Sequence, residues 1–413
     1  MERTFRKSLS NKNYQCTGVG MSSVMTPETL SEGISRLVSV NPLFSEKNLK
    51  VIVIANEKAG GFTQVKQSQK NAGILQAALE RAASKQTVTK NTESRLIITE
   101  EQGQAIRLVA EIAESALPDK DSFYLIVTAG GDGTSSEVQN GLFKFAHESE
   151  EKKNLVMNRM AVLRLPIGTG NDGTDGHTFS EAVELLEESL HFANARAIKM
   201  SVAGNPTKEQ IAEAGKDPAE YGDAETPAPW YAFNVAGIGL DAFVCWKANI
   251  MKAKHPGDSY KLMLDFATLN YNKAFPPEDA VLKIYRDDEL LESVKTSFEI
   301  LVFGVSGHRM FGGGKQILPE ENNIAYVKKL DVMTMVMNSR KFEDGSYTST
   351  NLASCFKGNR ITVEYAHPIL CEMDGETHLL LKENFPVTLE LTDPCVQVIE
   401  SDSLVYDKGT VRK

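Results

Sequence analysis

The chain has 413 residues, a formal net charge of −10, 41% hydrophobic residues and 24% charged residues. This composition is typical of soluble globular proteins, and the length predicts two domains because single cores stop growing beyond about 250–300 residues. The negative charge argues against nucleic acid as a partner, because its phosphates would be repelled. It also argues against electrostatic binding to an anionic membrane. No apolar run approaches the ~20 residues that a membrane-spanning helix needs.

The cysteines and histidines show no spacing that indicates disulfide bonds or a metal site. Five cysteines are scattered and form no CxxC pair, which predicts reduced thiols in the cytoplasm. The seven histidines have no ligand-like spacing, so we expect no zinc site. The first residues are basic, but no apolar stretch follows them, so we do not expect a secretory signal. We expect residues 1–48 to form a mostly peripheral arm, with one short helix after Thr26 and Pro27.

From residue 49 onward, apolar runs alternate with segments of helical periodicity. The expected strands cover 51–55, 96–99, 123–128 and 161–165, and the expected helices cover 64–83, 104–115 and 180–190. This alternation predicts a parallel sheet with helices on both faces and ligands at the carboxyl ends of the strands.

The second half of the chain reads as a series of short strands. They are expected at 196–202, 230–235, 280–285, 297–305, 332–337, 361–365, 369–372, 378–381 and 387–391. Many strands without intervening helices indicate a sandwich or barrel. The polar segment 204–229 is expected to be a surface insertion, whereas 247–275 has a helical pattern and is where we expect contact with a lipid chain.

The fold class is therefore predicted as α/β plus all-β. An N-terminal Rossmann-like, nucleotide-binding domain (49–194) is followed by a β-sandwich substrate domain (195–400) and a tail (401–413), with the active site in the interdomain cleft. We leave open that the last strands pack back on the first domain.

Two glycine-rich loops follow predicted strands. They are GGDGT at 130–134 and PIGTGND at 166–172. Glycines have no Cβ, so their backbone N–H groups can surround phosphate oxygens, and a strand–loop–helix arrangement points a helix N-terminus at an anion. Asp132 is the natural Mg²⁺ ligand beside a triphosphate. The alternative is that Asp132 and Gly133 form only a tight turn.

Other acidic residues have structural explanations that compete with functional ones. Thr134 and Glu137 fit a capping box, which we favour for Glu137. Asn171 and Asp172 could cap the next helix. Asp-Gly at 374–375 lies between two apolar runs and taken alone is best interpreted as a hairpin turn.

The motifs together resemble the diacylglycerol kinase catalytic family, which includes bacterial lipid kinases and sphingosine kinases. GGDGT followed by EVxNG at 137–141, the PxGTGND loop, NxxAGG at 56–61 and DGE at 374–376 occur in the family's order over roughly residues 50–400. GGDGT alone also occurs in NAD kinases, but GTGND and the late DGE indicate the lipid kinases.

The resemblance implies an ATP- and Mg²⁺-dependent lipid kinase that transfers the γ-phosphoryl group to a lipid hydroxyl, with diacylglycerol giving phosphatidic acid as the leading candidate. It implies Asp374 as general base, Glu376 as a catalytic carboxylate that helps to hold the metal, and Asp132 as the other metal ligand. The implied nucleotide-binding residues are Asn56, Gly60, Gly61, Thr99, Gly130, Gly131, Asp132, Gly133, Thr134, Gly168, Thr169, Gly170, Asn171 and Asp172. A sphingoid or soluble-alcohol kinase and a catalytically silent nucleotide-binding module remain alternatives.

The chain departs from the family pattern in several places. Glu57 stands where the family has proline, and Gln104 where it often has aspartate. Gly-Thr-Asp at 173–175 replaces a family segment that ends in arginine, so a basic contact is missing. The segment 327–332 lacks an Asp and a Gly of the family's DGxLDV, so we do not carry over the structural magnesium of some members. Arg309 and Lys315 flank three glycines and face either phosphate or solvent.

The expected partners are ATP and a lipid substrate at a membrane surface, and no nucleic acid. A homodimer and a peripheral membrane location of the cytoplasmic protein stay open.

Overall fold

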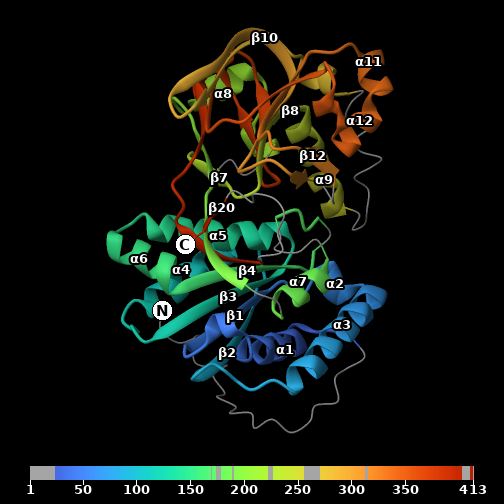
Figure 1. Ribbon diagram of the computed structural model, residues 1–413. Coiled ribbons are helices and arrows are strands. Elements are labelled where there is room, and N and C mark those ends of the chain that lie inside the picture. The colour runs from blue at the N-terminus through green and yellow to red at the C-terminus, as the bar shows by residue number, and fades with distance from the viewer. Residues whose placement is uncertain are drawn as a thin grey trace.

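The computed structural model describes residues 24–168, 170–173, 178–187, 190–221, 227–254, 270–311, 315–401 and 410–412. Two large sheets, one above the other in Figure 1, organise the described chain. The first has the strand order β2-β1-β3-β4-β19-β5-β20, and the second is an 11-stranded antiparallel sheet. The predicted α/β domain followed by a β-rich domain is confirmed.

The first sheet is built on four parallel strands. They are β1 (Asn48–Ala55), β2 (Asn91–Ile98), β3 (Ser122–Gly130) and β4 (Met160–Pro166). All nine residues of β3 are buried, as expected for a central strand with helices on both faces.

The helices of this domain divide between the two faces (Figure 1). One core cluster joins the sheet to α1 (Pro27–Ser39), α3 (Val65–Ala83) and α7 (Phe179–Leu185); the other joins it to α4 (Gln104–Ala116), α5 (Asp132–Ala146) and α6 (Glu150–Asn158). The short helix α2 (Gly60–Thr63) follows β1. The helix expected at 180–190 ends at Leu185, and β5 (Leu190–Ala195) follows it.

The helix α1 corrects the expectation of a peripheral arm. Thr26 and Thr29 form a capping box at its start, and Pro27 occupies the first turn. Leu30 and Ile34 are fully buried against the first sheet and α3. The turn η1 (Pro42–Phe44) buries Phe44 in the same cluster. Residues 24–48 are therefore part of the first core; only 1–23 lie outside the described residues.

The second sheet is one antiparallel sheet that curls around its own core. Its strands are β6 (Ile198–Ser201), β7 (Trp230–Ala232), β8 (Val235–Gly239), β9 (Asp279–Arg286), β10 (Glu289–Gly304), β13 (Ile324–Lys328), β14 (Ala353–Phe356), β15 (Arg360–Glu364), β16 (Ile369–Met373), β17 (Glu376–Leu380) and β18 (Val387–Leu391). The 16-residue β10 pairs with β9 over its first half and with β8 and β13 over its second. This shared strand makes a curled sheet where we expected a sandwich of two sheets.

The last strands return to the first sheet. β19 (Val396–Ser401) pairs in parallel with β4 and antiparallel with β5, and β20 (Thr410–Arg412) pairs with β5. The option that the chain's end packs back on the first domain is confirmed.

Several segments decorate the second sheet. The insertion 204–229 holds α8 (Lys208–Ala214) and η2 (Pro218–Glu220), neither with a buried residue, as expected for a surface insertion. α9 (Leu240–Lys254) overlaps the start of the segment 247–275 and is helical as expected. Residues 255–269 of the expected lipid-contact segment lie outside the described residues. β11 (Arg309–Phe311) and β12 (Lys315–Leu318) form a small separate hairpin, and η3 (Ser346–Ser349) and η4 (Lys382–Asn384) complete the elements.

The expected strand at 332–337 is wrong. The segment forms helix α11 (Val332–Met337), followed by α12 (Ser339–Asp344). The Asp331 side chain accepts the N–H of Thr334 at 3.0 Å, and this N-cap starts a helix where an apolar run alone suggested a strand.

The burial of α1 generates a stability prediction. We expect Ile34→Ala to lower the free energy of unfolding by about 2–5 kcal/mol, because it leaves a cavity in the core. The control is Val65→Ala, since Val65 is 62% exposed. Urea unfolding followed by circular dichroism measures both, and equal, small effects would mean that α1 does not support the core.

Candidate active site

The two glycine loops meet at the carboxyl edge of the first sheet. A Cβ added to Gly168 would collide with the Cα of Gly131, so glycine is required where the loops touch. The N–H of Gly61, in α2, donates to the carbonyl of Ile167 at 2.8 Å. The structure therefore brings three of the predicted glycine segments together.

The N-terminus of α5 is open toward this edge. Gly131 is its N-cap and has no side chain that could cap the helix. The first N–H groups of a helix have no intrahelical acceptor and carry partial positive charge, so they bind anions. A Cβ on Gly131 would have only the Cα of Gly168 nearby, at 3.8 Å, and a Cβ on Gly133 nothing within 4 Å. The backbone here is accessible to a phosphate.

Two other predicted nucleotide-binding residues lie at the same edge. Asn56 follows β1, and its Oδ1 accepts the N–H of Lys58 at 3.0 Å. Thr99 follows β2, and its Oγ1 donates to the carbonyl of Ala55 at 3.3 Å. These hydrogen bonds fix the side chains of Asn56 and Thr99 at the carboxyl edge of the sheet. That either residue binds a nucleotide stays a prediction. Thr169 lies outside the described residues.

Asp132 lies where the first loop contacts the second. Its Oδ1 accepts the N–H of Gly173 at 3.1 Å, and Gly170 packs so closely on Oδ2 that a Cβ there would overlap it. Burial, and then the charge of Asp172, raise the pKa of Asp132 to about 6. Two carboxylates are thus held together at the loop edge.

Asp374 reaches this region from the second sheet. It sits at the turn between β16 and β17 with φ 51°, so the hairpin interpretation of Asp-Gly is also correct. Its carboxylate accepts the N–H groups of Phe233 at 2.5 Å, Asn234 at 2.9 Å and Val235 at 3.0 Å. Burial raises the pKa of Asp374 although these donors oppose the shift. Gly173 lies between the acids of the two sheets, since a Cβ added to it would lie 3.9 Å from both Asp132 Oδ1 and the Cβ of Asn234, whose N–H donates to Asp374.

Glu372 is a carboxylate that the sequence interpretation missed. It is fully buried, and its Oε2 accepts the N–H of Gly375 at 2.9 Å. Gly237 leaves room for it, since a Cβ there would lie 3.0 Å from Glu372 Oε1 and 2.5 Å from Asp241 Oδ2. Burial, and then the charge of Asp241, raise the pKa of Glu372 well above its usual range. No local pattern marked Glu372, because Asp374 lies in the turn after β16 and Asp241 lies on a different element.

Glu376 is placed differently from Glu372. It begins β17, and its side chain is exposed. Its predicted part in catalysis and in holding the metal stays a prediction.

Arg164 is the second charged residue that the sequence interpretation missed. It is 6% exposed, lies in β4 and donates to Gln139 Oε1 at 3.3 Å. Its charge lowers the pKa of Asp374. The signal was a lone arginine within an otherwise apolar buried strand. Arg164 therefore places a positive charge near the acidic residues. The chain lacks the arginine that the family has after GTGND.

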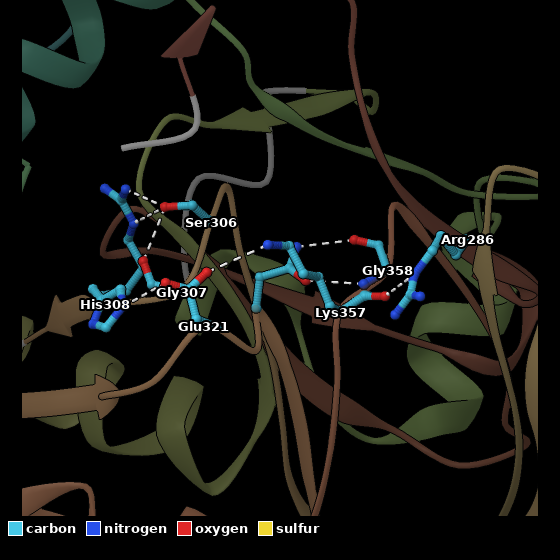
Figure 2. A network of polar contacts seen from close by, with 9 residues as sticks. Arg286, Ser306, Gly307, His308, Glu321, Lys357 and Gly358 are labelled. Carbon is cyan, nitrogen blue, oxygen red and sulfur yellow. Dashed lines mark hydrogen bonds and ion pairs between the residues drawn. The ribbon is translucent and has the colours of Figure 1, made fainter. Parts of the chain in front are cut away.

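Arg309 is not solvated. It is buried, and its guanidinium donates to Ser306 Oγ through Nε at 3.0 Å and through a second nitrogen. Figure 2 shows the surrounding network, in which Glu321 contacts both His308 and Lys357 at 3.3 Å. These contacts stabilise the chain before the 312–314 glycines, which lie outside the described residues.

Glu137 has a structural role, but not the one expected. Its carboxylate accepts the N–H of Gly103 at 2.8 Å and that of Ala105 at 3.0 Å, at the start of α4. Its own helix begins earlier, at Asp132, so the predicted capping box with Thr134 does not form. Glu137 therefore caps the neighbouring helix.

The donor set fits a magnesium ion only in part. In the described part of the chain no group of three or more His, Cys, Asp or Glu side chains is arranged to hold a metal. Asp132 and Asp172 are hard oxygen donors whose mutual repulsion a cation would relieve. Since Mg²⁺ commonly binds through one or two carboxylates plus substrate phosphates, this pair fits an ion completed by a nucleotide.

Among the helices that the structure describes, none is long and apolar enough to cross a membrane. Cys245, Cys355, Cys371 and Cys395 are free thiols in the described part of the chain.

Comparisons with known proteins confirm the family resemblance. Residues 50–203 match the family model of the diacylglycerol kinase catalytic domain. A Cronobacter sakazakii protein named "Probable lipid kinase YegS-like" is 26% identical over 224 residues, which cover 54% of this chain and 58% of that protein. A Caenorhabditis elegans protein named "Probable diacylglycerol kinase 3" is 28% identical over 141 residues, 32% of this chain and 16% of that protein. The chain thus matches little more than half of the first relative and a small part of the second.

A solved structure supports the fold. The chain is similar to the solved structure named "A putative diacylglycerol kinase from Bacillus anthracis str. Sterne", with a TM-score of 0.51 and 19% identity. The match covers 86% of this chain and 98% of that one. At this identity the likeness shows the shared fold of both domains.

The raised pKa of Asp132 generates a pH-dependent prediction. A carboxyl group whose folded pKa lies above its unfolded value loses its stabilising contribution as pH rises through the folded pKa, here about 6. We therefore expect Asp132→Asn to raise the melting temperature at pH 8 and to have little effect near pH 4. Thermal unfolding monitored across this range measures the difference.

The control for this prediction has the opposite sign. Lys50 Nζ donates to Asp119 Oδ2 at 2.6 Å, and this hydrogen bond lowers the pKa of Asp119. Asp119→Asn should lower the melting temperature at neutral pH, with the loss shrinking as pH falls below about 4. If both variants respond to pH in the same direction, the acids at the loop edge do not repel one another as described.

Proposed function

We propose that this chain, whose residues 50–203 match the diacylglycerol kinase catalytic domain, is an ATP- and Mg²⁺-dependent lipid kinase. It transfers the γ-phosphoryl group to a lipid hydroxyl, and diacylglycerol, giving phosphatidic acid, is the first candidate. The observation that carries the proposal is the approach of Asp374, from the second sheet, to Asp132 beside the two glycine loops of the first.

The loop edge suits the nucleotide. Phosphoryl transfer depends on positioning and on neutralising phosphate charge. The free N–H groups at the start of α5 would bind the phosphates, with Gly131 and Gly168 letting them approach closely. Bound Mg²⁺ would neutralise the charge on the phosphates, held by Asp132 and Asp172, and by Glu376 if the family pattern holds.

Asp374 suits the acceptor side. An ionised carboxylate has about four lone-pair sites, and three are used by backbone N–H groups. The remaining site is available to accept the hydroxyl proton as the bond to phosphorus forms. The raised pKa makes Asp374 a better base than an ordinary aspartate.

One observation favours a second candidate, a catalytically silent nucleotide-binding module. Asp132 and Asp374 both accept backbone N–H groups, as purely structural aspartates do. Binding of nucleotide without transfer would be the result for such a module. For the kinase we propose action in the cytoplasm, at a membrane surface.

Gly131→Val tests the nucleotide site. Gly131 has extended backbone (φ −91°, ψ −175°), which valine adopts, so the variant should fold while its side chain excludes phosphate. We expect calorimetry to detect Mg-ATP binding to the wild type but not to the variant. Gly73→Val, at an exposed helical position with nothing within 4 Å, is the control and should bind normally. No binding to the wild type at millimolar nucleotide would remove both candidates.

Asp374→Asn tests the base. Turnover should fall by about 10²–10⁴-fold while ATP affinity is kept, because the amide cannot accept the proton. Melting temperature shows whether the variant keeps the hydrogen bonds to 233–235. The wild-type pH profile is a second measurement: turnover should fall as pH drops through the raised pKa of Asp374.

The same assay decides the acceptor. Radiolabelled ATP is offered with diacylglycerol, sphingoid bases and soluble alcohols, the lipids in mixed micelles. Near wild-type turnover of Asp374→Asn would make Asp374 a turn residue only, and transfer to soluble alcohols alone would remove the lipid assignment.

A further inference from the structure

Exposed apolar side chains gather on one short helix of the second domain. In the part of the chain that the structure describes, six large hydrophobic side chains are exposed, and four belong to α11. They are Val332 (45%), Met333 (68%), Val336 (47%) and Met337 (76%). The other two, Val65 and Leu290, lie on α3 and β10, remote in sequence from α11 and from each other. Single exposed hydrophobics are ordinary, but a contiguous group marks an interaction surface.

The four side chains share one face of a helix that is firmly anchored. Val332 with Val336, and Met333 with Met337, are i,i+4 pairs, so they lie side by side. Met335 is 2% exposed and joins the core cluster that covers the outer face of the second sheet, with Leu330 packed against it. One face of α11 is held in the protein while the other presents apolar atoms outward.

Basic residues flank the apolar helix on both sides. Lys328 and Lys329 precede it, and Arg340 and Lys341 follow it. The three acidic residues nearby are Asp331, Glu343 and Asp344, of which Asp331 is engaged in capping α11. The segment 328–344 thus has a small positive excess in a chain of net charge −10.

The position of α11 makes this surface accessible. Figure 1 places α11 and α12 at the outer end of the second sheet, away from the first domain. An apolar helix face flanked by lysine and arginine matches the bilayer interface, which offers acyl chains below a layer of phosphates.

We propose that α11 is the element through which this protein docks on a phospholipid bilayer, its four apolar side chains entering the interface and Lys328, Arg340 and Lys341 meeting lipid phosphates, whereas Lys329 Nζ donates to the Pro277 carbonyl at 3.0 Å. The inference rests on the proposed function in that a lipid kinase must reach a membrane. It differs from the contact expected at 247–275, of which residues 255–269 lie outside the described residues and Tyr271 and Phe275 are buried.

Vesicle flotation tests the docking directly. The full chain is floated with vesicles of phosphatidylcholine containing a minority of phosphatidylglycerol, at low and high salt. We expect the wild type to float and the double variant Met333→Ser/Met337→Ser to lose ~10-fold or more of its binding, because two apolar side chains no longer enter the interface. The control, Val65→Ser/Leu290→Ser, removes two hydrophobic side chains that are 62% and 51% exposed elsewhere on the protein and should float like the wild type.

The salt dependence of flotation distinguishes the contribution of the basic residues around α11 from that of its apolar side chains. Reversal of charge at Lys328→Glu/Lys341→Glu should weaken flotation at low salt and have less effect at high salt, where charges are screened. The apolar contact should persist at high salt in the wild type.

The outcomes distinguish docking from the kinase proposal. Flotation has no kinase readout, so loss of flotation in the α11 variant supports docking even if no lipid is phosphorylated. Wild-type protein that does not float, or floats equally after the α11 substitutions, overturns the docking and leaves transfer in micelles untouched. Sedimentation of the same proteins is included: a wild-type dimer that the α11 substitutions dissociate, without flotation, would show a self-association surface instead.

Discussion

The hydrogen bonds that Asp374 accepts from Phe233, Asn234 and Val235 connect this proposed general base to the rest of the fold. The acceptor is the hairpin turn between β16 and β17, and the donors belong to the connection between β7 and β8. Phe233 also packs on Phe143 of α5, at 5.9 Å between ring centroids, and belongs to the core of the first domain. The carboxylate of Asp374 thus bonds a turn of the second sheet to the segment of Phe233, which packs in the core of the first domain. The position of Asp374 beside the glycine loops follows from this arrangement.

The site concentrates like charges, and the surrounding structure maintains them. Asp132 and Asp374 have raised pKa values, as does Glu372 beside Asp241. Such a cluster lowers stability at neutral pH, which is common where activity demands an unfavourable arrangement. Backbone N–H groups and Arg164 offset part of the repulsion. Asn171 and Asp374 have positive φ, a conformation that non-glycine residues rarely adopt, at the two loops that contact the acids.

Sequence patterns predicted the elements whose own residues determine them. The central strand β3 contains an unbroken apolar run, and glycine is required where the two loops touch at Gly168, so the sequence predicted both features. The first half of β2 is polar, and only its apolar end was predicted. The helix α11 was not, because an apolar run of six has no decisive period, and the cap from Asp331 decided its structure. Glu372 and Arg164 were missed because a single charged residue in an apolar strand does not reveal its partners, and only the tertiary arrangement brings Glu372 near Asp241 and Arg164 near Asp374. The capping role of Glu137 toward α4 is likewise a contact between elements, invisible in local spacing.

The net charge of −10 and a membrane partner are compatible if the charge is unevenly distributed. A uniformly acidic protein would be repelled by anionic lipid, but repulsion from most of the surface leaves one favourable approach where the local charge is positive and apolar groups protrude. The region around α11 meets both conditions. Its anchor, Met335, shares a core cluster with Leu370 of β16 and Leu379 of β17, the strands of the Asp374 hairpin. On the same side, Asn249 of α9 donates to the carbonyl of Gly375 at 2.9 Å. The core cluster that anchors α11 thus also includes residues of the two strands that carry the Asp374 hairpin, so the docking helix and the hairpin belong to one packed unit of the second domain.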